Sequence, residues 1–217
     1  MRIIDPKAEI MVPVYDLSVK TYMLGQMKMV EAIGRKCYKS EDKITADSYD
    51  KFIRMLVSKG HEAMIEHGHF SVCFTVDRGV SHELVRHRLA SWAQESTRYC
   101  NYSNDKFGGE ITVIKPFFFD EGSEEYDHWF KSMMYAESAY IQMLHAGRSP
   151  QEARSVLPNS LKTEVVMTAN FREWRNFFKL RADKPAHPQM RQVVKPLLEE
   201  CIALCPPVFD DLYHLVE

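Results

Sequence analysis

The 217-residue sequence lacks several signals that would place it in a familiar class of protein. No segment approaches the roughly 20 apolar residues of a membrane span, and the N-terminus, MRIIDPKAEI, has no apolar core of a secretion signal. Neither GxGxxG nor a P-loop occurs, so a standard dinucleotide or nucleoside-triphosphate fold has no support. Repeats, low-complexity tracts and Gly/Ser linkers are also missing. We therefore expect a single domain, residues 1–217, without a membrane segment.

The chain also has no surplus of positive charge. Lys plus Arg total 28 against 30 Asp plus Glu, whereas a general nucleic-acid-binding domain normally carries a basic excess. Five cysteines, an odd number, without a secretion signal favour free thiols in a reducing compartment. We expect a cytoplasmic protein that binds neither nucleic acid nor membrane. A local cationic pocket for a small phosphate ligand stays compatible with this balance of charge.

Hydrophobic periodicity predicts more helices than strands. The predicted helices are 18–35, 45–59, 80–88, 124–146, 171–182 and 188–204, and the predicted strands are 70–76, 111–116 and 163–169. These strands do not alternate regularly with the helices, which favours an α+β fold over a doubly wound parallel sheet. We predict an α+β protein with a small antiparallel or mixed sheet flanked by long helices.

An unusual concentration of cations lies in RHRLASWAQESTRY, residues 86–99. Arg86, His87, Arg88 and Arg98 fall within thirteen residues, and Glu95 is the only carboxylate among them. A solvated helix face with so many cations usually carries acidic partners at helical spacing. The imbalance indicates a site for an anion that comes from outside the chain.

A second unusual segment is the helix in FREWRNFFKLRAD. Asn170, Trp174, Phe177 and Arg181 share one helical stripe, which should face the interior. A guanidinium placed there needs an anion or acceptors, because it does not lose its proton. Two interpretations stay open: Arg181 snorkels or pairs with Asp183, or it binds a ligand. The adjoining stripe carries three polar side chains: Arg172, Asn176 and Lys179.

The histidines of HEAMIEHGHF raise the possibility of a metal site. His61 and His67 occur in the order H-E-x-x-x-E-H, which lacks the H-E-x-x-H spacing that puts two imidazoles on one helical face. His67 and His69 share a strand face, but no clear third ligand follows. We therefore predict no metal, and a metal-dependent hydrolase built on these histidines is kept as a weaker alternative.

Possible nucleophiles near the cations are Ser96 and Cys100. Without a base placed beside them, they are better explained as a hydrogen-bond donor and a plain thiol. Cys201 and Cys205 lie one helical turn apart in an apolar segment and have the pattern of core thiols. No cysteine is therefore predicted to act as a nucleophile.

The cationic stretch matches a long signature, RHR-x7-S-x-R, at residues 86–98. This pattern resembles that of the flavin-dependent thymidylate synthase family, and it fixes five residues at set spacing. Further segments resemble the family in the same order along the chain. They are GHEAMIEH at 60–67, ARSVLP at 153–158 and N-x-R-x3-N-x3-LRAD at 170–183. The resemblance runs from about residue 18 to residue 212.

The resemblance implies both an architecture and a reaction. It implies an α+β homotetramer whose active sites form where subunits meet. It implies an enzyme that makes dTMP from dUMP, taking a methylene group from methylenetetrahydrofolate and hydride from FAD reduced by NADPH. The alternative is a descendant that binds nucleotide and flavin without turnover.

The resemblance also implies roles for individual residues. The residues matched to FAD binding are His61, Arg86, His87, Arg88, Gln94, Asn170, Arg172 and Asn176, the last three acting from another subunit. The residues matched to dUMP binding are Glu83, Arg86, Gln94, Glu95, Ser96, Thr97, Arg98, Arg154 and Arg181. Among these, Ser96, Arg98 and Arg154 match the phosphate cradle. Arg181 matches the arginine that reads the uracil ring, and it is the expected catalytic residue.

Some positions depart from the family pattern. Ala93-Gln94 stands where Asn-Glu is usual, and Glu83 stands where Gln is usual. Ala63 replaces a hydroxyl residue and Cys37 replaces a serine. A carboxylate is thus lost at residue 94 and one is gained at residue 83. The exchange either relocates the charge or changes the affinity for the nucleotide.

Overall fold

The computed structural model describes residues 1–13, 17–104 and 107–217 and has an α+β architecture, as predicted. The helices are α1 (Val19–Tyr38), α2 (Ser48–Ser58), α3 (Arg78–Leu84), α4 (Glu124–His145), α5 (Pro150–Ala153), α6 (Phe171–Arg181), α7 (Pro188–Leu204) and α8 (Pro206–Phe209). The strands are β1 (Arg2–Ile4), β2 (Lys7–Met11), β3 (His69–Asp77), β4 (Ala90–Gln94), β5 (Thr112–Ile114) and β6 (Lys162–Asn170). Short 3₁₀ turns include η2 (Met64–His67) and η5 (Asp210–Leu215).

Within the described residues the strands form two sheets. Strand β1 pairs in parallel with β5, with Arg2 opposite Thr112, and the other four strands are ordered β2-β3-β6-β4. Alternate side chains of β3 from Phe70 to Val76 are buried, as the period-2 pattern of this segment predicts. Two of the four strands of this sheet, β3 and β6, are the apolar strands predicted from the sequence.

The chain divides into two compact units. Unit 1 comprises Met1–Lys7, Phe74–Arg86 and Ala93–Val165, and unit 2 comprises Ala8–Cys73, His87–Trp92 and Val166–Glu217. The chain passes from one unit to the other within strands β2, β3, β4 and β6 and between Arg86 and His87. Each unit has its own apolar interior.

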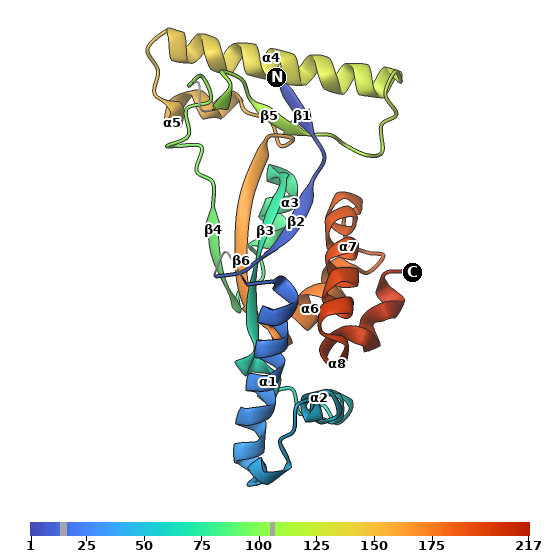
Figure 1. Cartoon of the computed structure of the whole chain (residues 1–217). Coiled ribbons are helices and arrows are strands. Elements are labelled where there is room, and N and C mark those ends of the chain that lie inside the picture. The colour runs from blue at the N-terminus through green and yellow to red at the C-terminus, as the bar shows by residue number, and fades with distance from the viewer. Residues whose placement is uncertain (14–16, 105–106) are drawn as a thin grey trace. The chain divides into compact units, whose positions relative to one another are not determined.

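In unit 1, helix α4 covers strands β1 and β5 (Figure 1). The Ser123 hydroxyl caps this helix, accepting a hydrogen bond from the Tyr126 amide at 3.1 Å. Met133 and Tyr140 lie about two and four turns beyond Tyr126. Both are buried in one cluster with Val113 of β5. The long amphipathic helix predicted between Ser123 and about residue 146 is confirmed.

In unit 2, aromatic side chains of α6 form the centre of the interior. The rings of Phe70 and Trp174 stack with centroids 4.6 Å apart and planes at 14°. Phe209 meets Phe70 and Phe171 edge to face. Gly68 allows this packing, because a Cβ at that position would lie 2.4 Å from the Phe171 ring. The apolar stripe predicted for this helix is confirmed by the burial of Trp174.

Helix α7 carries the two predicted core thiols. Cys201 and Cys205 are both buried and free of disulfides. Burial raises the pKa of the Cys201 thiol and raises that of Cys205 to about 12, so both stay protonated. Neither this helix nor any other in the described ranges has a stretch long and apolar enough to cross a membrane.

The predicted bounds of one helix were wrong. Helix α3 covers Arg78–Leu84 rather than 80–88, because the Asp77 carboxylate accepts a hydrogen bond from the Val80 amide at 2.7 Å and starts the helix earlier. Arg86–Arg88 therefore lie beyond its end. Strands β1, β2 and β4 were not predicted. The sequence of β4, ASWAQ, has no β-branched residue, and its pairing with β6 makes it a strand.

Candidate functional site

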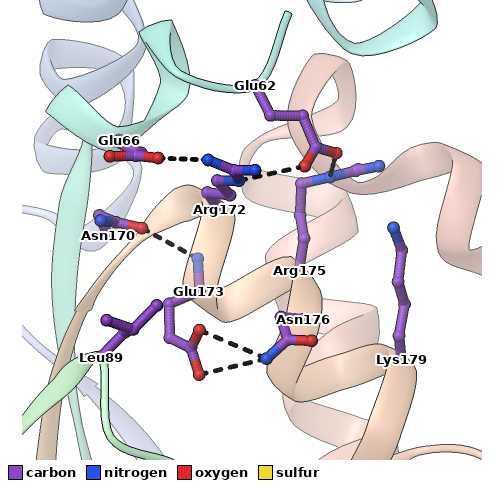
Figure 2. A pocket seen from close by; sticks show the side chains of 9 residues that line it. All are labelled: Glu62, Glu66, Leu89, Asn170, Arg172, Glu173, Arg175, Asn176 and Lys179. Atoms are coloured by element: carbon purple, nitrogen blue, oxygen red, sulfur yellow. Dashed lines mark hydrogen bonds and ion pairs between the residues drawn. The ribbon is translucent and has the colours of Figure 1, made fainter. Parts of the chain in front are cut away.

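A pocket of about 570 Å³ opens in unit 2 beside the first turns of α6. Figure 2 shows its lining side chains, which come mainly from α6 and from the segment around η2. They are Glu62, Glu66, Leu89, Asn170, Arg172, Glu173, Arg175, Asn176 and Lys179. The predicted polar stripe Arg172, Asn176 and Lys179 therefore lines one cavity, together with Asn170.

Helical geometry explains why these α6 side chains face the pocket. Arg172, Asn176 and Lys179 are spaced four and three residues apart and are all exposed, whereas the opposite face is packed in the aromatic interior. Asn170 starts the helix, since its side chain accepts a hydrogen bond from the Glu173 amide at 2.9 Å. The pocket thus lies at the N-terminal end of a capped helix.

Three acidic and three basic side chains line the pocket. Arg172 Nη1 lies 2.6 Å from Glu66 Oε1, and its Nε lies 3.5 Å from Glu62 Oε2 (Figure 2). Arg172 is half exposed, so the pair is open to exchange with another anion. Lys179 also lines the pocket and is exposed. The guanidinium and the ammonium are the groups suited to an anionic ligand.

Behind the pocket, a buried hydrogen-bonded chain joins Glu173, His87 and Arg181. Glu173 Oε1 lies 3.1 Å from His87 Nδ1, and Arg181 Nε lies 3.0 Å from His87 Nε2. Burial lowers the pKa of His87, as does the charge of Arg181, against the opposing effect of Glu173. Since the guanidinium Nε–H always donates, His87 Nε2 is the acceptor, and the proton of the neutral ring sits on Nδ1 and is donated to Glu173.

Three further residues matched to FAD binding are exposed: Arg86, Arg88 and His61. Arg86 of unit 1 and Arg88 of unit 2 are exposed on either side of the buried His87 in the sequence. His61 is exposed as well, and its Nδ1 lies 3.2 Å from the hydroxyl of Tyr38. The RHR triplet therefore presents its two guanidinium groups outward and its imidazole inward.

In unit 1, residues 94–98 lead from β4 into a turn beside Arg154. Arg154 Nη1 donates to Thr97 Oγ1 at 3.4 Å, although the two residues are 57 positions apart. The Arg98 amide donates to the Ser96 hydroxyl at 3.3 Å, which folds the turn. Gln94 Nε2 donates to Ser81 Oγ at 3.0 Å. The structure therefore brings the predicted phosphate-binding residues of unit 1 to one turn.

Glu95 is bound by groups within unit 1 that the sequence did not reveal. The Tyr102 hydroxyl donates to its Oε1 at 2.9 Å, and Lys162 Nζ donates to its Oε2 at 3.0 Å. Burial lowers the pKa of Lys162, but hydrogen bonds to Glu164 and Glu95 outweigh burial and raise it. Burial and Glu95 together raise the pKa of Tyr102. The Glu95 carboxylate therefore fixes the turn that follows β4 to strand β6, which carries Lys162 and Glu164.

Comparison with known proteins identifies the family. The family model described as "Thymidylate synthase complementing protein" matches residues 18–207. A flavin-dependent thymidylate synthase of Corynebacterium glutamicum is 31% identical, over 92% of this chain and 84% of that protein. The chain belongs to the flavin-dependent thymidylate synthase family. Two further members are similar to it. One from Mycobacterium sp. (strain KMS) is 32% identical, over 93% of this chain and 87% of that protein. One from Geobacter sulfurreducens is 31% identical, over 84% of this chain and 80% of that protein.

The residues matched to this family divide between the two units. The residues matched to dUMP lie in unit 1, except Arg181, which lies in unit 2. The residues matched to FAD lie in unit 2, except Arg86 and Gln94, which lie in unit 1. Among the described residues no group of three His, Cys, Asp or Glu side chains is arranged to hold a metal ion, the exposed His61 included.

Sequence reasoning did not single out Glu173, Tyr102 or Lys162 in this chain. A sequence signal existed for Glu173, which follows the cap Asn170 by three residues and precedes Phe177 by four, on a face that must be buried. No local signal existed for Lys162, since its partner lies 67 residues earlier in the chain.

Proposed function

We propose that this chain converts dUMP to dTMP by reductive methylation, with methylenetetrahydrofolate as carbon donor and NADPH-reduced FAD as hydride donor. The match over residues 18–207 to the flavin-dependent thymidylate synthases carries this proposal. The charge pattern supports it, because a pyrophosphate, a nucleotide phosphate and folate carboxylates give the exposed arginines anionic partners. A chain with formal net charge −2 then needs cations only locally.

The unit 2 pocket has donors suited to FAD. The amide groups of Asn170 and Asn176 and the charged ends of Arg172 and Lys179 can hold a pyrophosphate through hydrogen bonds and charge. His61, Arg86 and Arg88 are the further groups proposed to contact the cofactor. When bound, FAD supplies the hydride, which no protein side chain provides. The protein's part is to bind and orient the ligands.

For dUMP, we propose that the turn at 96–98 holds the phosphate. Ser96, Arg98 and Arg154 provide the donors, and the contact between Thr97 and Arg154 holds the turn and the arginine together. Gln94, Glu95, Glu83 and Arg86 are proposed as flanking groups. Glu95 acts by fixing the turn, since both carboxylate oxygens already accept hydrogen bonds.

We further propose a cytoplasmic homotetramer in which each chain forms one domain, residues 1–217. Large apolar side chains support assembly, because Leu89 and Tyr99 are 76% and 78% exposed within the cationic stretch. The absence of disulfides among all five cysteines is consistent with a reducing compartment. Light scattering of the purified protein tests the tetramer directly, and a monomeric mass would contradict it.

The function is tested by turnover of purified protein with dUMP, methylenetetrahydrofolate and NADPH, with dTMP measured by chromatography. Formation of dTMP that depends on all three substrates and on bound FAD is the expected result. Flavin absorption without turnover would instead support the non-catalytic flavoprotein. Metal found by elemental analysis in protein that lacks flavin would support the hydrolase.

The Cys100→Ser variant is expected to keep most of the activity. Cys100 is the cysteine closest to the signature, but its side chain packs against the apolar cluster of unit 1 and its amide donates to the Ser96 carbonyl at 3.0 Å. These contacts give it a packing role, and the flavin makes an enzyme thiolate unnecessary. Turnover and mass spectrometry are the measurements. An inactive variant that still binds both ligands, with a cysteine–nucleotide adduct in the parent protein, would contradict this prediction.

The Glu66→Gln variant is expected to bind FAD severalfold more tightly than the parent protein at low ionic strength. Glu66 pairs with Arg172 at the pocket and competes with an anionic ligand for that guanidinium, and an exposed pair is readily given up. Fluorescence titration with FAD measures the change. Glu41→Gln is the control, because Glu41 lies in the same unit with a side chain that is 37% exposed, and pairs with Lys36. Unchanged or weaker FAD binding in Glu66→Gln would contradict the role of Arg172.

A further inference from the structure

One buried carboxylate of α6, Glu173, has no place in the family motif. Glu173 is 5% exposed, and its partner His87 is 6% exposed. Both ring nitrogens of His87 are used inside the chain, one by Glu173 and the other by Arg181. An imidazole with both nitrogens engaged links its two partners through the ring. In this geometry His87 connects Glu173 to Arg181.

We propose that Glu173 and His87 are positioning residues that orient Arg181 toward the pyrimidine of dUMP. The proposal rests on the proposed function, and on Arg181 reading the base, which is the role that the family resemblance implies for it. The carboxylate of Glu173 holds the proton on His87 Nδ1, which keeps Nε2 available as the acceptor for Arg181 Nε–H. Because the guanidinium is rigid and planar, fixing one N–H bond fixes the directions of the other four.

Three further contacts hold the relay Glu173–His87–Arg181 in one geometry. The His87 ring lies edge to face against Phe177, with centroids 5.0 Å apart. The His87 carbonyl accepts a hydrogen bond from Trp92 Nε1 at 2.9 Å, which anchors the backbone of the RHR triplet. Asn176 Nδ2 lies 3.3 Å from Glu173 Oε2 and links the relay to the pocket (Figure 2). The imidazole cannot rotate without breaking both of its hydrogen bonds.

The electrostatics of this group are consistent with a positioning role. Burial and the charge of Arg181 lower the pKa of His87, so the ring stays neutral at physiological pH. A protonated ring would place an N–H opposite the Arg181 Nε–H, and the two donors would repel each other. Glu173 also balances the charge of Arg181 across the ring, which reduces the cost of a half-buried guanidinium. The three groups therefore form one unit with a single favoured proton arrangement.

The test measures dUMP affinity of the FAD-loaded protein by calorimetry, together with FAD content and thermal stability. Glu173→Gln replaces a charged acceptor with a neutral one of the same size, and the dUMP affinity of the FAD-loaded variant is expected to fall about tenfold. In an Arg181→Ala background the same substitution is expected to have no further effect, because Glu173 acts through that arginine. Glu31→Gln is the matched control: Glu31 is a buried unit 2 carboxylate whose hydrogen bonds go to Arg35 and Ser48. It should lower stability and leave dUMP affinity unchanged.

A second pair of variants applies if Glu173→Gln does not fold. His87→Gln can place an amide oxygen near the position of Nε2, whereas His87→Phe keeps the ring shape and removes the acceptor. His87→Gln is expected to bind dUMP more tightly than His87→Phe. Three results would overturn the relay and leave the proposed function standing. They are parent-like dUMP affinity in Glu173→Gln, equal dUMP affinity in the two His87 variants, and effects of Glu173→Gln and Arg181→Ala on dUMP affinity that simply add. Absence of dUMP binding in the parent protein would overturn the proposed function and the relay together.

Discussion

Arg181→Ala is expected to bind FAD as the parent protein does, while its kcat/KM for dUMP falls by on the order of 10²–10⁴-fold. Arg181 ends helix α6 and is partly buried, and its Nε is held by His87. A site built to hydrogen-bond a base edge loses both affinity and orientation when the donor is removed, since the polar groups of the base are left without partners. Steady-state kinetics and dUMP titration of the FAD-loaded variant measure the loss.

Two further variants sharpen this experiment. Arg181→Lys keeps the charge but not the planar fork, so it should recover little of the lost activity. Lys184→Ala, three residues later, removes an exposed cation and should behave like the parent protein. Unchanged dUMP affinity in Arg181→Ala would show that this arginine is structural, which is the other interpretation that its sequence allows.

Asp211→Ala is expected to lower the free energy of unfolding by about 3 kcal/mol, because it leaves the buried Arg175 guanidinium without its main counter-ion. Arg175 is 3% exposed, and its Nη1 and Nη2 donate to Asp211 Oδ1 and Oδ2 at 2.6 and 2.7 Å. The Val208 carbonyl and Glu62 stay as partners of Arg175, and the Asp211 side chain is itself 46% exposed. Both facts keep the expected cost at the low end of the range for a buried charge that loses its partner. For a chain of this length, the melting temperature should fall by about 6–12 °C.

The neighbouring carboxylate is the control for that prediction. Asp210 pairs with Arg54, and both of those side chains are more than 40% exposed. Asp210→Asn should therefore change the free energy of unfolding by less than about 1 kcal/mol. Equal losses in the Asp210 and Asp211 variants would contradict the assignment of Arg175–Asp211 as the pair that stabilises unit 2.

The same pair predicts how stability depends on pH. Burial raises the pKa of Asp211, but the hydrogen bonds and the attraction from Arg175 outweigh it, so the pKa lies below its usual value. A carboxyl group with a lowered folded-state pKa stabilises the fold above its unfolded-state pKa, near 3.9, and loses that contribution as the pH falls through the folded value. The stability difference between the parent and Asp211→Ala should be constant near neutral pH and shrink below about pH 4.

Local periodicity accounts for the parts of the fold that were predicted correctly. The burial of Trp174 follows from a 3.6-residue period, the alternation from Phe70 to Val76 from a period of two, and the start of α4 from a capping serine. Each of these signals lies within about one to three turns of chain. They need no knowledge of what the element packs against.

The errors occurred where pairing decides the structure. Residues 90–94 contain no run of β-branched residues and were not predicted as a strand, yet they form β4 because β6 lies beside them. Strand β1 pairs with β5 across more than a hundred residues, and its three residues carry too little pattern to reveal this. A strand needs a partner for its backbone groups, and the partner is a property of the whole chain.

The sequence by itself determined the family, the amphipathic helices and the identity of the polar side chains along α6. Only the tertiary structure decided the partner of each charge. Arg175 binds Asp211 and Arg172 binds Glu66, while Arg181 is held by a histidine 94 residues away. The physical reason is range: a helical period acts over a few residues, whereas an ion pair or a hydrogen bond depends on where distant segments of the chain meet.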